Sequence, residues 1–190
     1  MNPMPLRPRP SRLSRLTLLI CGFYVVMALT GLLLVLWRRD AWGSDPLAWP
    51  GLQPVGHLLL AALLVAVVHL GSRLWLRRSA RARRCAGTIR RQFHGMGRRD
   101  LLALALFSGI GEELLFRGWL LHETNLWWSS LLFGLVHLPP GRDWIHWPLF
   151  AAVIGLLLGL LTLGSGTVLW AILAHAGINY FNLRLAMDRS

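Results

Sequence analysis

The sequence has few acidic residues and no lysine. Its 190 residues include eight Asp and Glu, of which only three are glutamates, and all twenty basic residues are arginine, so that the formal net charge is +12. In a soluble protein this balance would suggest nucleic acid as a partner. Here the arginines gather between apolar runs, which is typical of segments at the surface of a membrane. We therefore expect a lipid bilayer around the chain and no nucleic-acid partner.

Cysteine is equally scarce, with Cys21 in an apolar run and Cys85 in an arginine-rich segment. Two isolated cysteines exclude a disulfide framework and a CxxC metal motif. Apolar residues dominate instead: 55% of the chain is hydrophobic and the mean hydropathy is +0.51. That composition is too apolar for a soluble domain and indicates an all-α membrane protein.

Six apolar runs are either long enough to cross a bilayer or short enough to lie buried among runs that do. They cover residues 16–37, 55–76, 100–121, 126–138, 147–163 and 167–187. The first run resembles a signal peptide, but it is long and no small-residue cleavage site follows it. The sequence therefore predicts a polytopic transmembrane helix bundle of about six spans.

The charges suggest how the bundle is oriented. Residues 1–15 are rich in proline and arginine, and we expect a disordered basic tail in the cytoplasm, followed by a single transmembrane bundle over residues 16–190. The loop at residues 77–99 carries nine arginines and no acid. The positive-inside rule places this loop and both termini in the cytoplasm of a multi-pass integral membrane protein.

Two of the three glutamates are adjacent and lie inside the third apolar run. Glu112 and Glu113 are about twelve residues into that run, or ~18 Å along a helix. A charged side chain at the centre of a bilayer costs roughly 3 kcal/mol, so a helix does not carry two of them without a use and a partner. Arg117 follows Glu113 by four residues and shares its helical face. The pattern predicts a buried polar site, with Asp100 as the N-cap of its helix.

Two later motifs carry further polar side chains. Phe133 and His137 are four residues apart in the fourth run, and His175 and Asn179 are four apart in the sixth. Residues at this spacing share one face of a helix. Three helices can therefore direct two carboxylates, two imidazoles and an amide into one interior pocket.

Such a set suits peptide hydrolysis. A carboxylate can take a proton from water and later return it to the leaving amine, and imidazole and amide N–H groups can stabilise the oxyanion. The same side chains alternatively suit zinc, held by Glu113, His137 and His175 with one open position. A non-catalytic membrane scaffold for immunity or partner binding also fits, whereas a transporter fits less well because no inverted repeat is visible.

The three motifs occur in a characteristic order: Glu-Glu-x-x-x-Arg, then Phe-x-x-x-His, then His-x-x-x-Asn. In this respect the chain resembles the CAAX-prenyl protease and bacteriocin-processing family of intramembrane proteases, also called the Abi or type II CAAX endopeptidase family. The resemblance covers about residues 100–180, which we expect to be the catalytic core. It implies hydrolysis of a membrane protein or peptide precursor, in a prokaryotic inner membrane, by a glutamate-activated water without a bound metal.

The resemblance also implies a role for each motif residue. Glu112 matches the glutamate that activates water, and His137 matches the histidine beside that water. His175 and Asn179 match the pair that stabilises the oxyanion. The remaining three residues match a supporting set: Glu113 and Arg117 as an ion pair, and Phe133 as a side chain that shapes the pocket.

Overall fold

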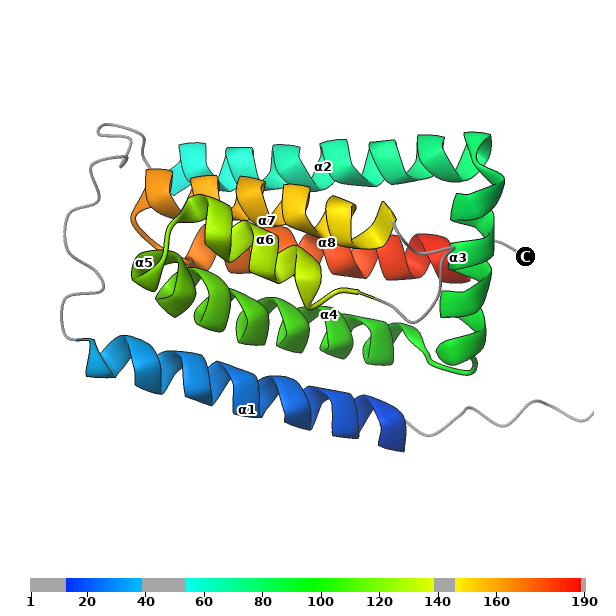
Figure 1. Ribbon diagram of the computed structural model, residues 1–190. Coiled ribbons are helices and arrows are strands. Elements are labelled where there is room, and N and C mark those ends of the chain that lie inside the picture. The colour runs from blue at the N-terminus through cyan, green and yellow to red at the C-terminus, as the bar shows by residue number, and fades with distance from the viewer. Residues whose placement is uncertain (1–12, 39–53, 139–145, 189–190) are drawn as a thin grey trace, which may run out of the picture.

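The computed structural model describes residues 13–38, 54–138 and 146–188, and every regular element in these ranges is a helix. This confirms the expected all-α bundle, whereas the expected basic tail lies almost entirely outside the described residues. Long helices run side by side, and one short helix, α3, lies across the end of the bundle (Figure 1). The elements are α1 (Arg15–Trp37), α2 (Pro54–Arg78), α3 (Ala80–Gln92), α4 (Arg98–Glu113), the π-helix η1 (Leu114–Leu120), α5 (Leu121–Glu123), α6 (Leu126–Leu135), α7 (His146–Ser165) and α8 (Leu169–Met187).

Six spans were expected, but fewer of the described helices are both long enough and apolar enough to cross a membrane. Among the described residues, only α1, α2 and α7 are long and apolar enough to cross a membrane. The third predicted span is divided because η1 interrupts it, and α6 has only ten residues. The sixth, α8, is 19 residues long but carries histidine, asparagine and arginine. The predicted spans that do not meet these two criteria are therefore the helices that carry the polar motifs, of which α6 is also short.

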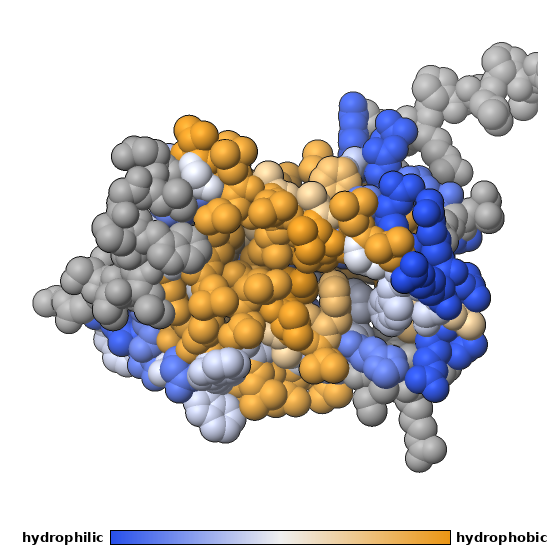
Figure 2. Space-filling model, turned by 90° about the horizontal axis from the view of Figure 1, so that it is seen from above, coloured by the Kyte–Doolittle hydropathy of each residue, from blue (hydrophilic) through white to orange (hydrophobic). Residues whose placement is uncertain are grey.

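The outer helices present apolar side chains to the surroundings. In the spanning windows of α1 and α2 only 17% of the residues are buried inside the protein. Leu19 and Leu33 on α1, for example, are 74% and 66% exposed. Figure 2 shows a broad apolar band across the molecule, with hydrophilic side chains gathered at the end where α3 lies. A band of this kind is what a lipid-facing surface requires.

The arginine-rich segment, which was expected to be a loop, is a helix. Alanine and arginine are both strong helix formers, and the Ser79 hydroxyl caps the start of α3 by accepting the backbone N–H of Ala82 at 3.2 Å. One face of α3 is buried, where Ala82 and Ala86 pack against Leu76 and Ala186. The segment is therefore an amphipathic helix that closes one end of the bundle.

The predicted N-cap at Asp100 is also wrong by three residues. Helix α4 starts at Arg98 after the N-cap Gly97, and Asp100 lies in the first turn, where a carboxylate is favourable near the helix N-terminus. Its Oδ2 accepts the backbone N–H of Gly97 at 2.9 Å. Its Oδ1 accepts the backbone N–H of Ser14 at 2.8 Å and the hydroxyl of Thr17 at 2.7 Å. Asp100 therefore joins α4 to the start of α1.

Helix α4 lies between α1 and α8, and this position brings the polar motifs together. At Gly109 a side chain would meet the backbone nitrogen of Ala176 at 3.0 Å, so glycine allows α8 to approach α4 closely. His175 is the neighbour of Ala176, and Glu112 follows Gly109 by three residues. The close approach of the two helices thus brings the glutamate motif beside the histidine of α8.

Candidate active site

The ion pair predicted between Glu113 and Arg117 is present and fully buried. Arg117 Nη1 donates to Glu113 Oε1 at 2.9 Å, and both residues are 0% exposed. Arg117 belongs to η1, which begins directly after Glu113. Short π-helical segments inside α-helices are frequent at functional sites, and regular periodicity in the sequence does not reveal them.

Phe133 supports the arginine from the neighbouring helix α6. The guanidinium of Arg117 lies over the Phe133 ring, 4.2 Å from its centroid, in a cation–π arrangement. A side chain at Gly155 on α7 would approach Arg117 Nη2 to 2.9 Å, so this glycine makes room for the guanidinium. Gly155 therefore serves packing inside the bundle.

His175 is oriented by the ion pair. Its Nδ1 lies 2.7 Å from Glu113 Oε1. An ionised carboxylate only accepts hydrogen bonds, so Nδ1 is the donor in this contact. The other ring nitrogen, Nε2, is then directed toward the second glutamate and lies 3.9 Å from Glu112 Oε2. Glu113 thus fixes which nitrogen His175 presents to the site.

His137 is oriented in the same way by a different group. Its Nδ1 lies 2.6 Å from the carbonyl oxygen of Phe133, and a carbonyl can only accept, so Nδ1 again donates. Its Nε2 lies 3.7 Å from Glu112 Oε2. Two imidazoles from different parts of the chain therefore present the same ring nitrogen to the same carboxylate oxygen.

Glu112 is the group on which these contacts converge. Its side chain is buried, and Oε2 has no hydrogen-bond partner within the part of the chain that the structure describes. The separations of 3.7 and 3.9 Å from the two imidazoles are too long for direct hydrogen bonds. A buried carboxylate oxygen without a partner is costly for the fold, and such an atom is available to a reactant.

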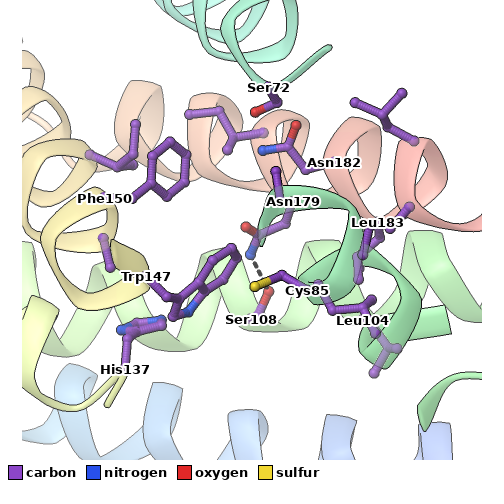
Figure 3. Close-up of a pocket in the computed structure, with 18 of the residues that line it drawn as sticks. Ser72, Cys85, Leu104, Ser108, His137, Trp147, Phe150, Asn179, Asn182 and Leu183 are labelled. Atoms are coloured by element: carbon purple, nitrogen blue, oxygen red, sulfur yellow. Dashed lines mark hydrogen bonds between the residues drawn. The ribbon is translucent and has the colours of Figure 1, made fainter. Parts of the chain in front are cut away.

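Asn179 is held by a residue that the sequence motifs did not indicate. Its Nδ2 donates to Ser108 Oγ at 2.9 Å, which is the dashed line in Figure 3. Ser108 is buried on α4, one helical turn before Glu112. One amide hydrogen of Asn179 serves this contact, and the second remains for another acceptor. The sequence feature that could have pointed to Ser108 is its spacing of four residues from Glu112.

A cavity of about 360 Å³ joins these groups, and its wall is otherwise largely apolar (Figure 3). Tyr24, from a helix with no motif, also lines it. Of the predicted site residues, Glu112, Phe133, His137, His175 and Asn179 line the cavity, whereas Glu113 and Arg117 are not among its lining residues. The structure therefore brings the three motifs to one place.

The alternative zinc set does not fit this arrangement. Glu113 Oε1 already accepts from Arg117 and His175, and the ring nitrogen of His175 that meets Glu113 is a donor there. Within residues 13–38, 54–138 and 146–188, no group of three or more His, Cys, Asp and Glu side chains is arranged to hold a metal ion. Glu113, His137 and His175 are therefore not arranged as a zinc site.

Comparison with known proteins identifies the domain that contains these motifs. The family model described as type II CAAX prenyl endopeptidase Rce1-like matches residues 98–181. No curated protein and no solved structure matches the chain. The matched residues run from the start of α4 into α8 and contain every predicted site residue. The region at residues 98–181 is therefore similar to the Rce1-like type II CAAX prenyl endopeptidase domain, in agreement with the resemblance that the order of the motifs indicates.

Proposed function

We propose that the chain hydrolyses a peptide bond of a membrane protein or peptide precursor with a water molecule that Glu112 activates. The match of residues 98–181 to the family model supports a CAAX-type intramembrane peptidase with membrane-associated peptide substrates. The observation that carries the finer proposal is the buried Oε2 of Glu112, which has no hydrogen-bond partner among the described residues and faces two imidazole nitrogens.

In the first step Glu112 and His137 hold the attacking water. Glu112 Oε2 and His137 Nε2 lie 3.7 Å apart, a separation that one water molecule can bridge by donating to both. Because His137 Nδ1 donates to a backbone carbonyl, Nε2 of the neutral ring is an acceptor. The water oxygen attacks the peptide carbonyl carbon as Glu112 takes one of its protons.

In the second step the site stabilises the oxyanion that forms on the attacked carbonyl. Asn179 has one amide hydrogen left after its bond to Ser108 and can donate it to this oxygen. His175 can donate from Nε2 when both ring nitrogens carry protons, since Nδ1 then still donates to Glu113. Donors fixed before the reaction stabilise the developing charge without having to reorganise.

In the last step the tetrahedral intermediate collapses and the C–N bond breaks. The proton held by Glu112 passes to the leaving nitrogen, which departs as an amine, and the other product is a carboxylic acid. Glu112 is ionised again at the end, so the cycle consumes one water molecule and needs no cofactor. The zinc-dependent alternative predicts the same products and is separated from this proposal by a chelator.

The membrane setting follows from the apolar surface. We propose that the end closed by α3, where the arginines of residues 77–99 gather, faces the cytoplasm of a prokaryotic cell, with both termini on that side. The exposed leucines of α1 and α2 then lie against lipid, and the cavity opens to substrates that are held in or at the bilayer.

The test compares three purified proteins in liposomes: the wild type, Glu112→Gln and Glu123→Gln. Glu123 is the third glutamate of the chain, is exposed, and pairs with Arg38 at the surface, so it is a matched control. A library of membrane peptides is incubated with each protein, with and without a chelator, and products are identified by mass spectrometry.

We expect cleavage by the wild type and Glu123→Gln, none by Glu112→Gln, and no effect of the chelator. Wild-type rates from Glu112→Gln would contradict the role of the carboxylate. Loss of wild-type cleavage in the chelator, restored by zinc, would favour the metal-dependent alternative.

A further inference from the structure

Helix α1 lies outside the matched family domain but forms part of the wall of the site. It packs along α4 and η1. Two glycines allow the backbones to touch: a side chain at Gly31 would meet the backbone of Leu114 at 2.7 Å, and one at Gly111 would meet the carbonyl oxygen of Tyr24 at 2.7 Å. A real Cβ does not fit at such distances, so α1 and α4 can be this close only with glycine at these positions.

The position of α1 along α4 is fixed as well as its distance. At the start of α1, Asp100 accepts hydrogen bonds from the Ser14 backbone and the Thr17 hydroxyl. Thr17 is 0% exposed, so this contact is buried. The contacts at Asp100, Gly111 and Gly31 follow one another along α1, and together they prevent the helix from sliding or turning against α4.

This docking brings Tyr24 to the glutamate. Tyr24 lines the same cavity as Glu112, His137 and His175. Its phenol and the Glu112 carboxylate are close enough to interact electrostatically. Its Cβ and Cδ1 lie 3.3 Å from the position that a Cβ of Gly111 would take, which places the ring against the residue before Glu112.

We propose that Tyr24 is a positioning residue for Glu112, contributed by a helix outside the family domain. Its hydroxyl donates to the carboxylate and holds one oxygen, which leaves Oε2 for the water between the imidazoles. The proposal rests on the proposed role of Glu112. It gives α1 a function in catalysis in addition to its contact with lipid.

The chemistry of a general base explains why such a donor is useful. A carboxylate that rotates freely spends little time with its reacting oxygen beside the water, whereas one fixed by a hydrogen bond is held in the productive geometry. Among the charged and titratable groups around Glu112, His137 and His175 face its Oε2, and the buried pair Glu113 and Arg117 lies nearby. None of these is from α1.

The test removes only the hydroxyl. Tyr24→Phe keeps the ring against Gly111, and Tyr180→Phe is the matched control, because the chain has just two tyrosines and Tyr180 interacts with Arg184 outside the cavity. Both full-length variants are assayed on the peptide that the wild type cleaves fastest. Infrared spectra of each protein are also recorded, and the carboxylate band of Glu112 is assigned by subtracting the spectrum of Glu112→Gln.

We expect Tyr24→Phe to lower kcat about ten- to a hundredfold, with KM within about twofold of the wild type, because the hydrogen bond serves the reacting group and not substrate binding. The Glu112 infrared band should shift, because the carboxylate loses a hydrogen-bond donor. Tyr180→Phe should match the wild type in kcat, in KM and in the Glu112 infrared band.

Three results would overturn the proposal. The first is a wild-type kcat in Tyr24→Phe. The second is an unshifted Glu112 band, a measurement that needs no substrate. The third is a loss of activity in Tyr24→Leu but not in Tyr24→Phe, which would give the ring a packing role only. An active Glu112→Gln would instead reject the proposed function, so the two failures are distinguishable.

Discussion

The Nδ1 atom of His175 lies 2.7 Å from Oε1 of Glu113, and this contact decides which nitrogen of the imidazole meets Glu112. The same Oε1 accepts from Arg117 at 2.9 Å. One carboxylate therefore neutralises a buried guanidinium and orients a ring of the site at once. The two adjacent glutamates have different tasks as a result. Glu113 is engaged through Oε1 by Arg117 and His175, whereas Glu112 directs Oε2 toward the two imidazoles. Oε2 of each glutamate has no hydrogen-bond partner among the described residues.

This difference predicts that Glu112→Gln and Glu113→Gln lose activity for different reasons. Neutralising Glu113 leaves the charge of Arg117 buried without its partner, which costs roughly 3–5 kcal/mol. We expect Glu113→Gln to be inactive and to unfold at a clearly lower temperature. Glu112→Gln should be inactive with an unfolding temperature close to that of the wild type.

Thermal unfolding of both purified variants in the same detergent, followed by tryptophan fluorescence, provides the measurement. Glu123→Gln serves as the control for loss of an exposed glutamate. Equal unfolding temperatures for Glu113→Gln and the wild type would mean that the buried pair is not the support that its geometry indicates.

The hydrogen bond between Asn179 and Ser108 makes a second prediction. Ser108→Ala removes the acceptor that holds the Asn179 amide, and Asn179 then loses its fixed direction. Because the amide acts on the oxyanion and not on the bound substrate, we expect kcat to fall about tenfold with little change in KM. Steady-state kinetics on a cleaved peptide measures both constants.

The control is Thr30→Ala, which likewise removes one hydroxyl. The Thr30 hydroxyl lies away from the site and donates to the Val26 carbonyl of its own helix. Its kinetics should equal those of the wild type. A wild-type kcat in Ser108→Ala would show that Asn179 keeps its direction without the serine.

The helical bundle and the meeting of the three motifs were predictable because each rests on local signals. Long apolar runs predict helices, and the pairing of Glu113 with Arg117 follows from their spacing on one turn. The π-helix that begins at Leu114 was not predictable, since widening of a turn leaves no trace in the hydrophobic period. The arginine-rich segment was mistaken for a loop because its charge outweighed its helix-forming composition.

Parts of the site that depend on tertiary packing could not be read from the sequence. Tyr24 lies in an apolar run and belongs to none of the three motifs, and the docking of α1 at Gly31 and Gly111 brings it near Glu112. The directions of His137 and His175 depend on a backbone carbonyl and a carboxylate, which no spacing rule specifies. The sequence thus indicates which groups meet, and packing determines how they face one another.

Gly155 on α7 makes a third prediction. A methyl group there would lie 2.9 Å from Arg117 Nη2 and 3.2 Å from Phe133 Cδ1, so Gly155→Ala must displace the guanidinium or the ring. Overpacking of this kind typically costs about 1–3 kcal/mol. Since Arg117 and Phe133 support the site, we expect a lower unfolding temperature together with reduced cleavage.

Gly71→Ala is the matched control, because a side chain at this glycine of α2 meets nothing within 4 Å. Alanine is the better helix former, so this variant should be as stable as the wild type or slightly more stable. Both variants are measured in parallel. If Gly155→Ala changed neither the unfolding temperature nor cleavage, α7 could move away from the ion pair without loss of stability or activity.

Asp100 makes the last prediction, because its carboxylate is the acceptor that joins the starts of α1 and α4. Asp100→Ala leaves the Ser14 and Gly97 backbone N–H groups and the Thr17 hydroxyl without this acceptor. Loss of a charged acceptor from partly buried donors costs about 1–3 kcal/mol. We expect a lower unfolding temperature, and faster hydrogen exchange confined to the first turns of these two helices. Asp188→Ala, which removes an exposed carboxylate near Arg184, should change neither quantity. Unchanged exchange at the start of α1 in Asp100→Ala would mean that the glycine contacts alone hold this helix in place.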